Sequence, residues 1–208
     1  DTRGFILDER YFTTLAFVDL SPEGERTFSF ARKPGADTQI TEKELDMEIL
    51  GNTKIFHVGS LSLTSEPARS TTFAAIKAAK SAGAVISYDP NYRATLWENV
   101  ETAKREMKSL IPFVDIMKIS DEETELLTDE KEPEQAAKVL MGKGVKLVAV
   151  TLGKDGAYIA NAEGGKRVPG FESNVVDTTG AGDAFWGTFL YKLSQSNESI
   201  EKITLDMA

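Results

Sequence analysis

Hydrophobic and polar positions follow two different patterns along this chain. Between residues 4 and 31, short apolar runs at 5–7, 14–18 and 27–30 are separated by turn residues. Runs rich in β-branched and aromatic residues between turn signals are typical of strands. The first part of the chain is therefore predicted to be a small strand-rich unit without helices.

From residue 54 onward, the pattern changes to a repeated succession of strand, loop and helix. The strands are expected at 55–58, 84–88, 116–119, 146–151 and 175–176, and the helices at 65–82, 97–110, 121–127 and 133–141. Such alternation with short connections indicates an α/β fold with a mostly parallel sheet flanked by helices. Ligands of these sheets bind beyond the carboxyl ends of the strands, where small, polar and charged residues gather in this chain.

Composition narrows the classes of partner. With 208 residues, 41% of them hydrophobic and 27% charged, the chain has the composition of an ordinary globular protein. A formal charge of −9 disfavours nucleic acid and anionic membrane, so a small molecule is the expected partner. The absence of cysteine excludes disulfides and thiolate chemistry and is compatible with a cytoplasmic location. No apolar run approaches the ~20 residues of a spanning helix.

The strongest chemical signal is the segment Asp177-Thr178-Thr179-Gly180-Ala181-Gly182-Asp183. Apolar residues recur after it at helical spacing, so the segment is expected to open a helix. Glycines allow close approach of a ligand, and the first N–H groups of a helix bind anions with the help of the helix dipole. A phosphate group is the expected occupant.

Asp183 stands inside that anion site, where its charge would repel a phosphate. It is better suited to accept a proton from an alcohol during phosphoryl transfer. The simpler interpretation of an aspartate at this position is that it complements the helix dipole. A P-loop motif is absent, and a dinucleotide-binding fingerprint fails because Phe185 stands where its last glycine or alanine belongs.

The nine residues 177–185 closely resemble the second signature of the PfkB carbohydrate kinases, also called the ribokinase-like family. Further segments resemble the fructokinase branch of that family; they lie at 56–60, 89–93, 118–123 and 150–157. The resemblance implies a ribokinase-like α/β fold with a small β-strand lid. Residues 1–33 would form part of the lid and adjoining strands, and residues 34–208 the nucleotide- and substrate-binding core. The first sugar-binding signature and the C-terminal part of the family pattern have no counterpart, so the chain is expected to be truncated at both ends.

The resemblance also implies roles for individual residues. Asp183 would be the catalytic base, with the backbone N–H groups of Gly180, Ala181 and Gly182 forming an anion hole. Asp89, Asn91 and Arg93 would bind the substrate, although Asp89 also fits a turn and Arg93 a surface ion pair. The expected nucleotide-binding residues are Thr151, Gly153, Gly156 and Lys118, of which Lys118 also fits a solvated strand end.

The expected cofactors are ATP and Mg²⁺, with K⁺ as a monovalent cation. The family holds magnesium through water with an Asn-x-x-Glu element, which appears here as Ser120-Asp121-Glu122-Glu123. Only Glu123 is retained as a candidate for that role. Asp177 and Thr179 would lie near the monovalent cation. The lid suggests a homodimer formed by strand pairing.

Other aromatic and titratable residues are expected to be structural. His57, the single histidine, is predicted to be a satisfied core or supporting residue rather than a base, and Trp97 and Trp186 are expected in the core. Phe17, Phe28 and Phe30 either pack on the sugar or form a contact between lids.

Taken together, these residues predict a fructokinase-like enzyme that transfers a phosphoryl group from ATP to the primary hydroxyl of fructose. Alternatives of the same chemistry are kinases of 2-keto-3-deoxygluconate or ribose. A non-catalytic nucleotide or sugar sensor is the alternative of another class, and a nicotinamide-dependent dehydrogenase is disfavoured by Phe185.

Overall fold

The structure, a computed structural model, describes residues 2–20, 26–172, 174–175, 177–196, 200–203 and 205. The described residues form two sheets. The strands of the smaller one are β1 (Leu15–Leu20) and β2 (Arg26–Ala31), which pair in antiparallel fashion. The larger sheet has the strand order β3-β4-β5-β6-β7-β8. Its strands are β3 (Ile55–Gly59), β4 (Val85–Asp89), β5 (Ile116–Ser120), β6 (Leu147–Thr151), β7 (Ala157–Asn161) and β8 (Gly164–Val168).

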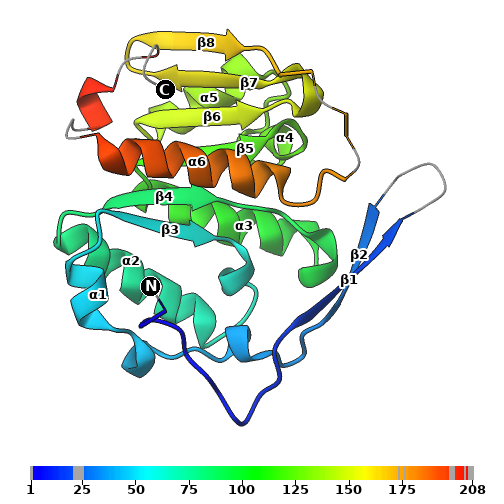
Figure 1. Ribbon diagram of the computed structural model, residues 1–208, viewed down its shortest axis with the longest axis vertical. Coiled ribbons are helices and arrows are strands. Elements are labelled where there is room, and N and C mark those ends of the chain that lie inside the picture. Colours follow the sequence, from blue (N-terminus) through cyan, green and yellow to red (C-terminus); the bar gives the residue numbers. More distant parts are fainter. Residues whose placement is uncertain are drawn as a thin grey trace.

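Strands β3 to β6 run parallel, whereas β7 and β8 are added as an antiparallel edge. The helices are α1 (Met47–Gly51), α2 (Ala68–Ser81), α3 (Val100–Leu110), α4 (Asp121–Thr128), α5 (Pro133–Gly142) and α6 (Ala181–Gln195). This arrangement confirms the predicted α/β fold with a mostly parallel sheet and a small two-stranded unit. Figure 1 shows α6 across one face of the sheet, α2, α3 and α5 on the other, and the β1–β2 ribbon projecting from the body.

Two apolar clusters hold the layers together. The larger one lies between the sheet and helices α2 to α5, and its fully buried members include Ile76, Met107 and Met117. The smaller one joins α6 to the opposite face through Trp186, with Ile116 and Ala149 from the strands. Because side chains alternate across a strand, neighbouring residues of β5 serve the two clusters. The helix that carries the predicted base is thereby fixed to the centre of the sheet.

Most predicted element boundaries lie within three residues of those observed, and the differences are as follows. Residues 5–7 form no strand, and Val175 lies in none, while Val176 lies outside the described residues. The helix expected from residue 97 begins at Val100, because Asn99 accepts a hydrogen bond from the Thr102 N–H at 2.8 Å and caps it. Strands β7 and β8 were not predicted at all.

Candidate active site

The carboxyl ends of the parallel strands meet at one edge of the sheet. Gly59 of β3 is paired with Asp89 of β4, and Ser120 of β5 with Thr151 of β6. The register therefore brings several predicted site residues to the same edge. This is the position at which ligands bind in open α/β sheets.

The glycine loop opens α6, as predicted. Gly180 is the N-cap residue with φ of +77°, a left-handed conformation that favours glycine, and no side chain caps the helix there. The Ala181 N–H donates to the Thr178 carbonyl at 3.1 Å, so this one of the three expected anion-hole donors already has a partner. Asp183 lies exposed in the first turn. A carboxylate thus stands beside a helix start that has room for an anion.

Asp89 and Lys118 form a buried ion pair. Lys118 Nζ lies 2.8 Å from Asp89 Oδ2, and the two side chains are 8% and 5% exposed. A Cβ added at Gly182 would lie 3.1 Å from Lys118 Nζ. The lysine therefore reaches the first turn of α6, and a side chain at position 182 would require it to move by a few tenths of an ångström. Both residues were expected to contact ligands, but here each one neutralises the other.

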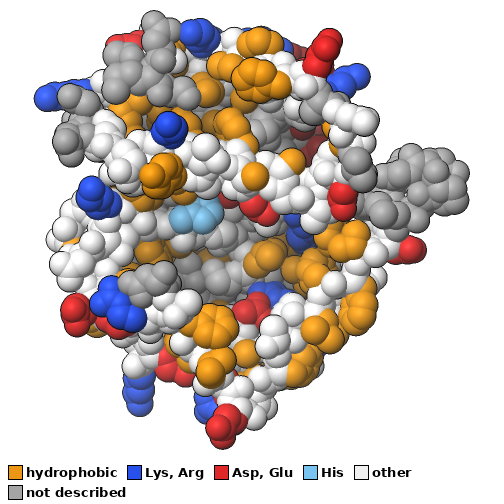
Figure 2. Space-filling model, in the orientation of Figure 1, with side chains coloured by type: hydrophobic (Ala, Val, Ile, Leu, Met, Phe, Trp, Pro, Cys, Tyr) orange, Lys and Arg blue, Asp and Glu red, His pale blue; other side chains and the backbone are white. Residues whose placement is uncertain are grey.

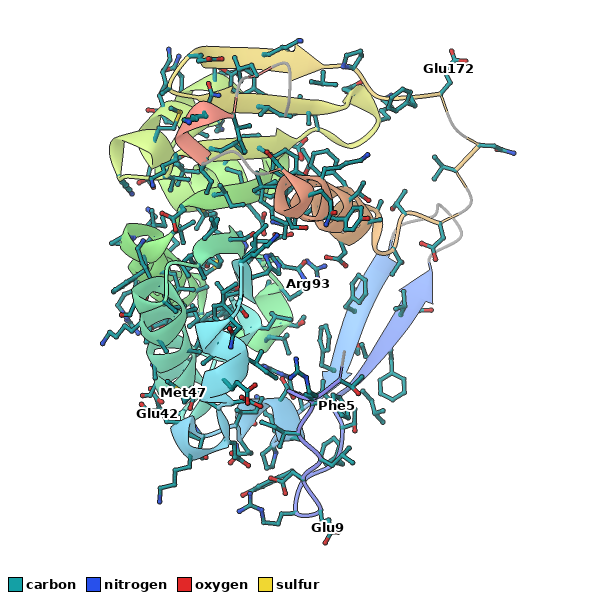
Figure 3. The ribbon with its side chains drawn as sticks, turned by 60° about the vertical axis from the view of Figure 1, so that its left-hand side comes forward. Phe5, Glu9, Glu42, Met47, Arg93 and Glu172 are labelled. Atoms are coloured by element: carbon teal, nitrogen blue, oxygen red, sulfur yellow. The ribbon has the colours of Figure 1, made fainter. Side chains whose placement is uncertain are left out.

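The segment after β4 approaches the two-stranded ribbon. Asn91 has φ of +49°, and its N–H donates to Asp89 Oδ1 at 3.2 Å. The Arg93 guanidinium lies over the Phe28 ring of β2, 5.4 Å from its centroid, in a cation–π contact. Figure 3 shows Arg93 on the side of the core that faces the ribbon. The predicted substrate residues Asn91 and Arg93 thus lie between the sheet edge and the ribbon.

Glu123 is buried and holds two chain segments together. Its Oε1 accepts the Tyr92 N–H at 2.7 Å, and its Oε2 accepts the Ser120 N–H at 2.9 Å. Burial raises the pKa of Glu123, and these two hydrogen bonds act in the opposite direction. Each oxygen keeps a further lone pair, so a contact to a metal-bound water is compatible with this arrangement. Direct ligation would compete with both N–H groups.

The predicted nucleotide-binding residues lie after β6. Thr151 Oγ1 donates to the Ile119 carbonyl at 3.4 Å, and Gly153 has φ of +56°. Gly156 has φ of +92°, and a Cβ there would collide with the Val168 carbonyl. The backbone alone therefore explains the glycine at position 156.

Two further predicted residues precede α6. Asp177 Oδ1 accepts the Thr179 N–H at 2.8 Å, and both residues are exposed. Within the described part of the chain, no three His, Asp or Glu side chains gather closely enough to suggest a metal site. In the same residues, no helix combines the length and apolar character needed to cross a membrane.

Sequence reasoning missed Ser87, which joins His57 to Trp186. Trp186 is buried as predicted, whereas His57 is exposed, so the prediction that His57 lies in the core is wrong and only a supporting role fits it. Ser87 Oγ lies 2.9 Å from His57 Nδ1 and accepts the Trp186 Nε1–H at 2.9 Å. Partial burial lowers the pKa of His57; the Asp89 and Asp183 carboxylates raise it, and Lys118 lowers it. Figure 2 shows the single histidine, in pale blue, with acidic and basic side chains close by. Strand register brings His57 and Ser87 together, and the packing of α6 on the sheet adds Trp186, so no local motif reveals Ser87.

A mainly parallel sheet with a two-stranded ribbon at its side is the architecture of the ribokinase-like fold, and comparisons with known proteins agree. The family model of the pfkB family carbohydrate kinases matches residues 1–205. Fructokinase-2 of Oryza sativa subsp. japonica is 43% identical over 198 residues, which are 95% of this chain and 59% of that protein. The chain belongs to the PfkB family of carbohydrate kinases.

Solved structures show the same similarity. Fructokinase from Vibrio cholerae O395 in its fructose-, ADP- and calcium-bound form matches with a TM-score of 0.86 and 34% identity, over 95% of this chain and 64% of that one. A double mutant of the same protein, with fructose, ADP and potassium bound, matches with a TM-score of 0.87 and 33% identity, over 97% and 64%. This chain thus spans less than two thirds of the length of these relatives.

Proposed function

We propose that the protein phosphorylates a primary hydroxyl of a sugar at the expense of ATP, with fructose as substrate and fructose 6-phosphate as product. The observation that carries this proposal is the Asp183 carboxylate in the first turn of α6, beside the Gly180 start of that helix. The similarity to a fructokinase with fructose and ADP bound supports the choice of sugar and nucleotide.

In this mechanism, Asp183 accepts the proton of the attacking hydroxyl. The sugar oxygen forms a bond to the γ-phosphorus, the bond from that phosphorus to the β,γ-bridging oxygen breaks, and ADP leaves. The backbone N–H groups at Gly180 and Gly182, with the helix dipole, stabilise the charge on the transferred group. An exposed carboxylate at a helix start suits this role because it is accessible to an alcohol.

The surrounding residues would place the two substrates. Asn91 and Arg93 would hydrogen-bond sugar hydroxyls under the ribbon, with Asp89 and Lys118 shaping the strand ends beside them. Thr151, Gly153 and Gly156 would border the nucleotide. We propose that residues 1–33 act as the lid over this site and that residues 34–208 form the core.

The chemistry that a bound Mg²⁺ would supply is positive charge against the nucleotide phosphates. Glu123 would hold the ion through water, since both oxygens of Glu123 already accept backbone N–H groups. Asp177 and Thr179 would lie beside a K⁺ ion, in keeping with the potassium-bound relative. We further propose a cytoplasmic location and a homodimer formed through the lid.

The test is ADP formation by the chain with ATP, Mg²⁺ and fructose, compared with the variant Asp183→Asn. We expect the variant to lose ~10²-fold or more in kcat because general base catalysis contributes this much. ADP binding, measured by calorimetry, should remain. Asp129→Asn is the matched control, since Asp129 lies exposed at the far end of α4 with φ of +64°, a conformation that asparagine tolerates.

The outcomes separate the parts of the proposal. If ribose or 2-keto-3-deoxygluconate stimulates ADP formation and fructose does not, the reaction stands and the sugar is wrong. If the chain binds ADP but no sugar stimulates turnover, or if Asp183→Asn is as fast as the parent, the mechanism is wrong. A nucleotide-binding sensor would then describe the protein better.

A further inference from the structure

Three side chains from three elements form a hydrogen-bonded chain beneath the predicted base. His57 of β3 and Ser87 of β4 are direct neighbours in the parallel register. Ser87 is fully buried, and Trp186 of α6 is 2% exposed. Their polar atoms meet at Ser87 Oγ, at 2.9 Å from His57 Nδ1 and 2.9 Å from Trp186 Nε1.

When His57 is neutral, Ser87 Oγ can either donate to His57 Nδ1 or accept from it, because a hydroxyl has one proton and two lone pairs. An indole N–H only donates, so Ser87 Oγ accepts from Trp186. In the arrangement that matters for the proposal, the hydroxyl donates its single proton to His57 Nδ1, and Nδ1 carries no proton. The neutral imidazole therefore holds its proton on Nε2.

The three hydrogen-bonded side chains are connected to the helical turn that carries Asp183. Trp186 follows Asp183 by three residues and lies on the same side of α6. Its ring stacks on Phe189 with centroids 4.9 Å apart and planes within 2°, so the indole has little freedom to turn. Because the stacked ring has little room to move, we expect a change in the hydrogen bond at Nε1 to displace the helix backbone.

We propose that His57 and Ser87 are positioning residues that hold Trp186, and with it the first turn of α6, and that protonation of His57 weakens this hold. An effect of this coupling on catalysis rests on the proposed role of Asp183 as the catalytic base. The coupling itself does not, because it concerns only the three hydrogen-bonded side chains.

Protonation of His57 changes the hydrogen bonds among the three side chains because Nδ1 then becomes a donor. Ser87 Oγ would have to accept from both His57 and Trp186, and its own proton would lose its present acceptor. Three charged groups face the imidazole: Asp89 at the end of β4, Asp183 on α6 and Lys118 at the end of β5. Partial burial against the sheet nevertheless lowers the pKa of His57 from its ordinary value, so the imidazole gains its proton only as the pH becomes acidic.

NMR tests this coupling without turnover. The chain has one histidine and two tryptophans, so the imidazole signal is unique and the indole N–H signals are two. We expect the Trp186 indole N–H and the backbone amides of 180–184 to shift with the same midpoint as the His57 ring. The Trp97 indole, whose buried N–H has no hydrogen-bond partner, is the internal control and should not follow.

Three variants separate the hydrogen-bonded chain from a direct effect of charge. In Ser87→Ala, His57 still titrates, but the shifts of the Trp186 indole and the first-turn amides should disappear. Trp186→Phe keeps the ring stacking and lacks the N–H, so the amide shifts should disappear there too. His57→Asn keeps a neutral acceptor near the position of Nδ1. The Trp186 indole and first-turn amide signals should therefore keep the positions they have in the parent chain with neutral His57, at all pH values between 5 and 8.

Two results would overturn the proposal. One is a Trp186 signal that does not follow the His57 midpoint in the parent chain. The other is amide shifts that survive unchanged in Ser87→Ala and Trp186→Phe, since the Asp183 turn would then sense only the charge of His57. If the chain turns over fructose, His57→Asn should also remove one acidic limb from the pH profile of kcat with KM unchanged. An absence of turnover would count against the proposed function and leave the NMR result as the measure of this inference.

Discussion

The buried ion pair of Asp89 and Lys118 is stable only while both charges are present. Removing two charges from water is costly, and the attraction between them offsets the cost only while both are present. The pair also receives the Asn91 N–H at Asp89 Oδ1. Either residue alone would be an uncompensated charge at the edge of the sheet.

Lys118→Met should therefore destabilise the fold by about 3–5 kcal/mol, because it leaves the Asp89 carboxylate buried without a partner. The double variant Asp89→Asn with Lys118→Met should recover part of that loss. Urea unfolding followed by circular dichroism measures both. Arg105→Ala is the surface control: the Arg105 side chain is 67% exposed and lies 2.9 Å from Glu106, so a loss of less than about 1 kcal/mol is expected. Equal losses for Lys118→Met and Arg105→Ala would contradict the assignment of a buried pair.

Single residues differ in how far the sequence reveals their role. Gly180 and Asp183 belong to one continuous string, so their place at a helix start was predicted correctly. Asp89 and Lys118 lie 29 positions apart, and their pairing depends on β4 and β5 being neighbours. A polar residue at a strand end fits a ligand contact equally well, which is why sequence reasoning assigned both to ligands.

At the scale of elements, the β1–β2 ribbon is connected to the core by two arginines. Arg32, just after β2, is buried and donates to Asp37 at 2.7 Å, to Thr64 Oγ1 at 2.7 Å and to the Leu61 carbonyl at 2.8 Å. Arg93 contacts Phe28 from the core side. The base of the ribbon is thus fixed by a planar donor group whose geometry lysine cannot reproduce.

Arg32→Ala should release the base of the ribbon and leave the main sheet intact. Hydrogen exchange measured by mass spectrometry should become faster in β1 and β2, while β4 to β6 keep their protection. Arg10→Ala provides the comparison, since Arg10 is 70% exposed and contacts its chain neighbours Asp8 and Tyr11. If exchange in the ribbon were the same in Arg32→Ala and Arg10→Ala, Arg32 would not be its anchor.

Element prediction failed where tertiary context decides. Residues 5–7 are β-prone but have no partner strand in the described chain, so their composition alone does not make a strand. Strand β8 has a single apolar residue, Val168, and is exposed along its length. Strand β8 forms because it pairs with the buried β7, and no alternation of apolar and polar residues in the sequence predicts it.

At the scale of the whole molecule, the succession of strands and helices was enough to predict the parallel sheet and its ligand edge. The repeated pattern leaves few topologies open, because such crossovers are short and right-handed. The antiparallel edge could not be predicted, since β7 and β8 follow β6 without a helix between them. Dimer formation could not be predicted from the sequence either, because it depends on which face of the β1–β2 ribbon remains exposed.

The face of the β1–β2 ribbon that points away from Arg93 is apolar and exposed. Val18 pairs with Phe28, which lies under Arg93, so the side chains of Leu15 and Phe17 point to the opposite face of the ribbon. They are 51% and 58% exposed. Apolar side chains gathered on an exposed sheet favour a second copy. We expect a dimer in sedimentation velocity, and monomers for Leu15→Lys with Phe17→Lys. Val100→Lys, an exposed apolar position at the start of α3, should remain dimeric; a parent chain that sediments as a monomer at all concentrations would refute assembly through the lid.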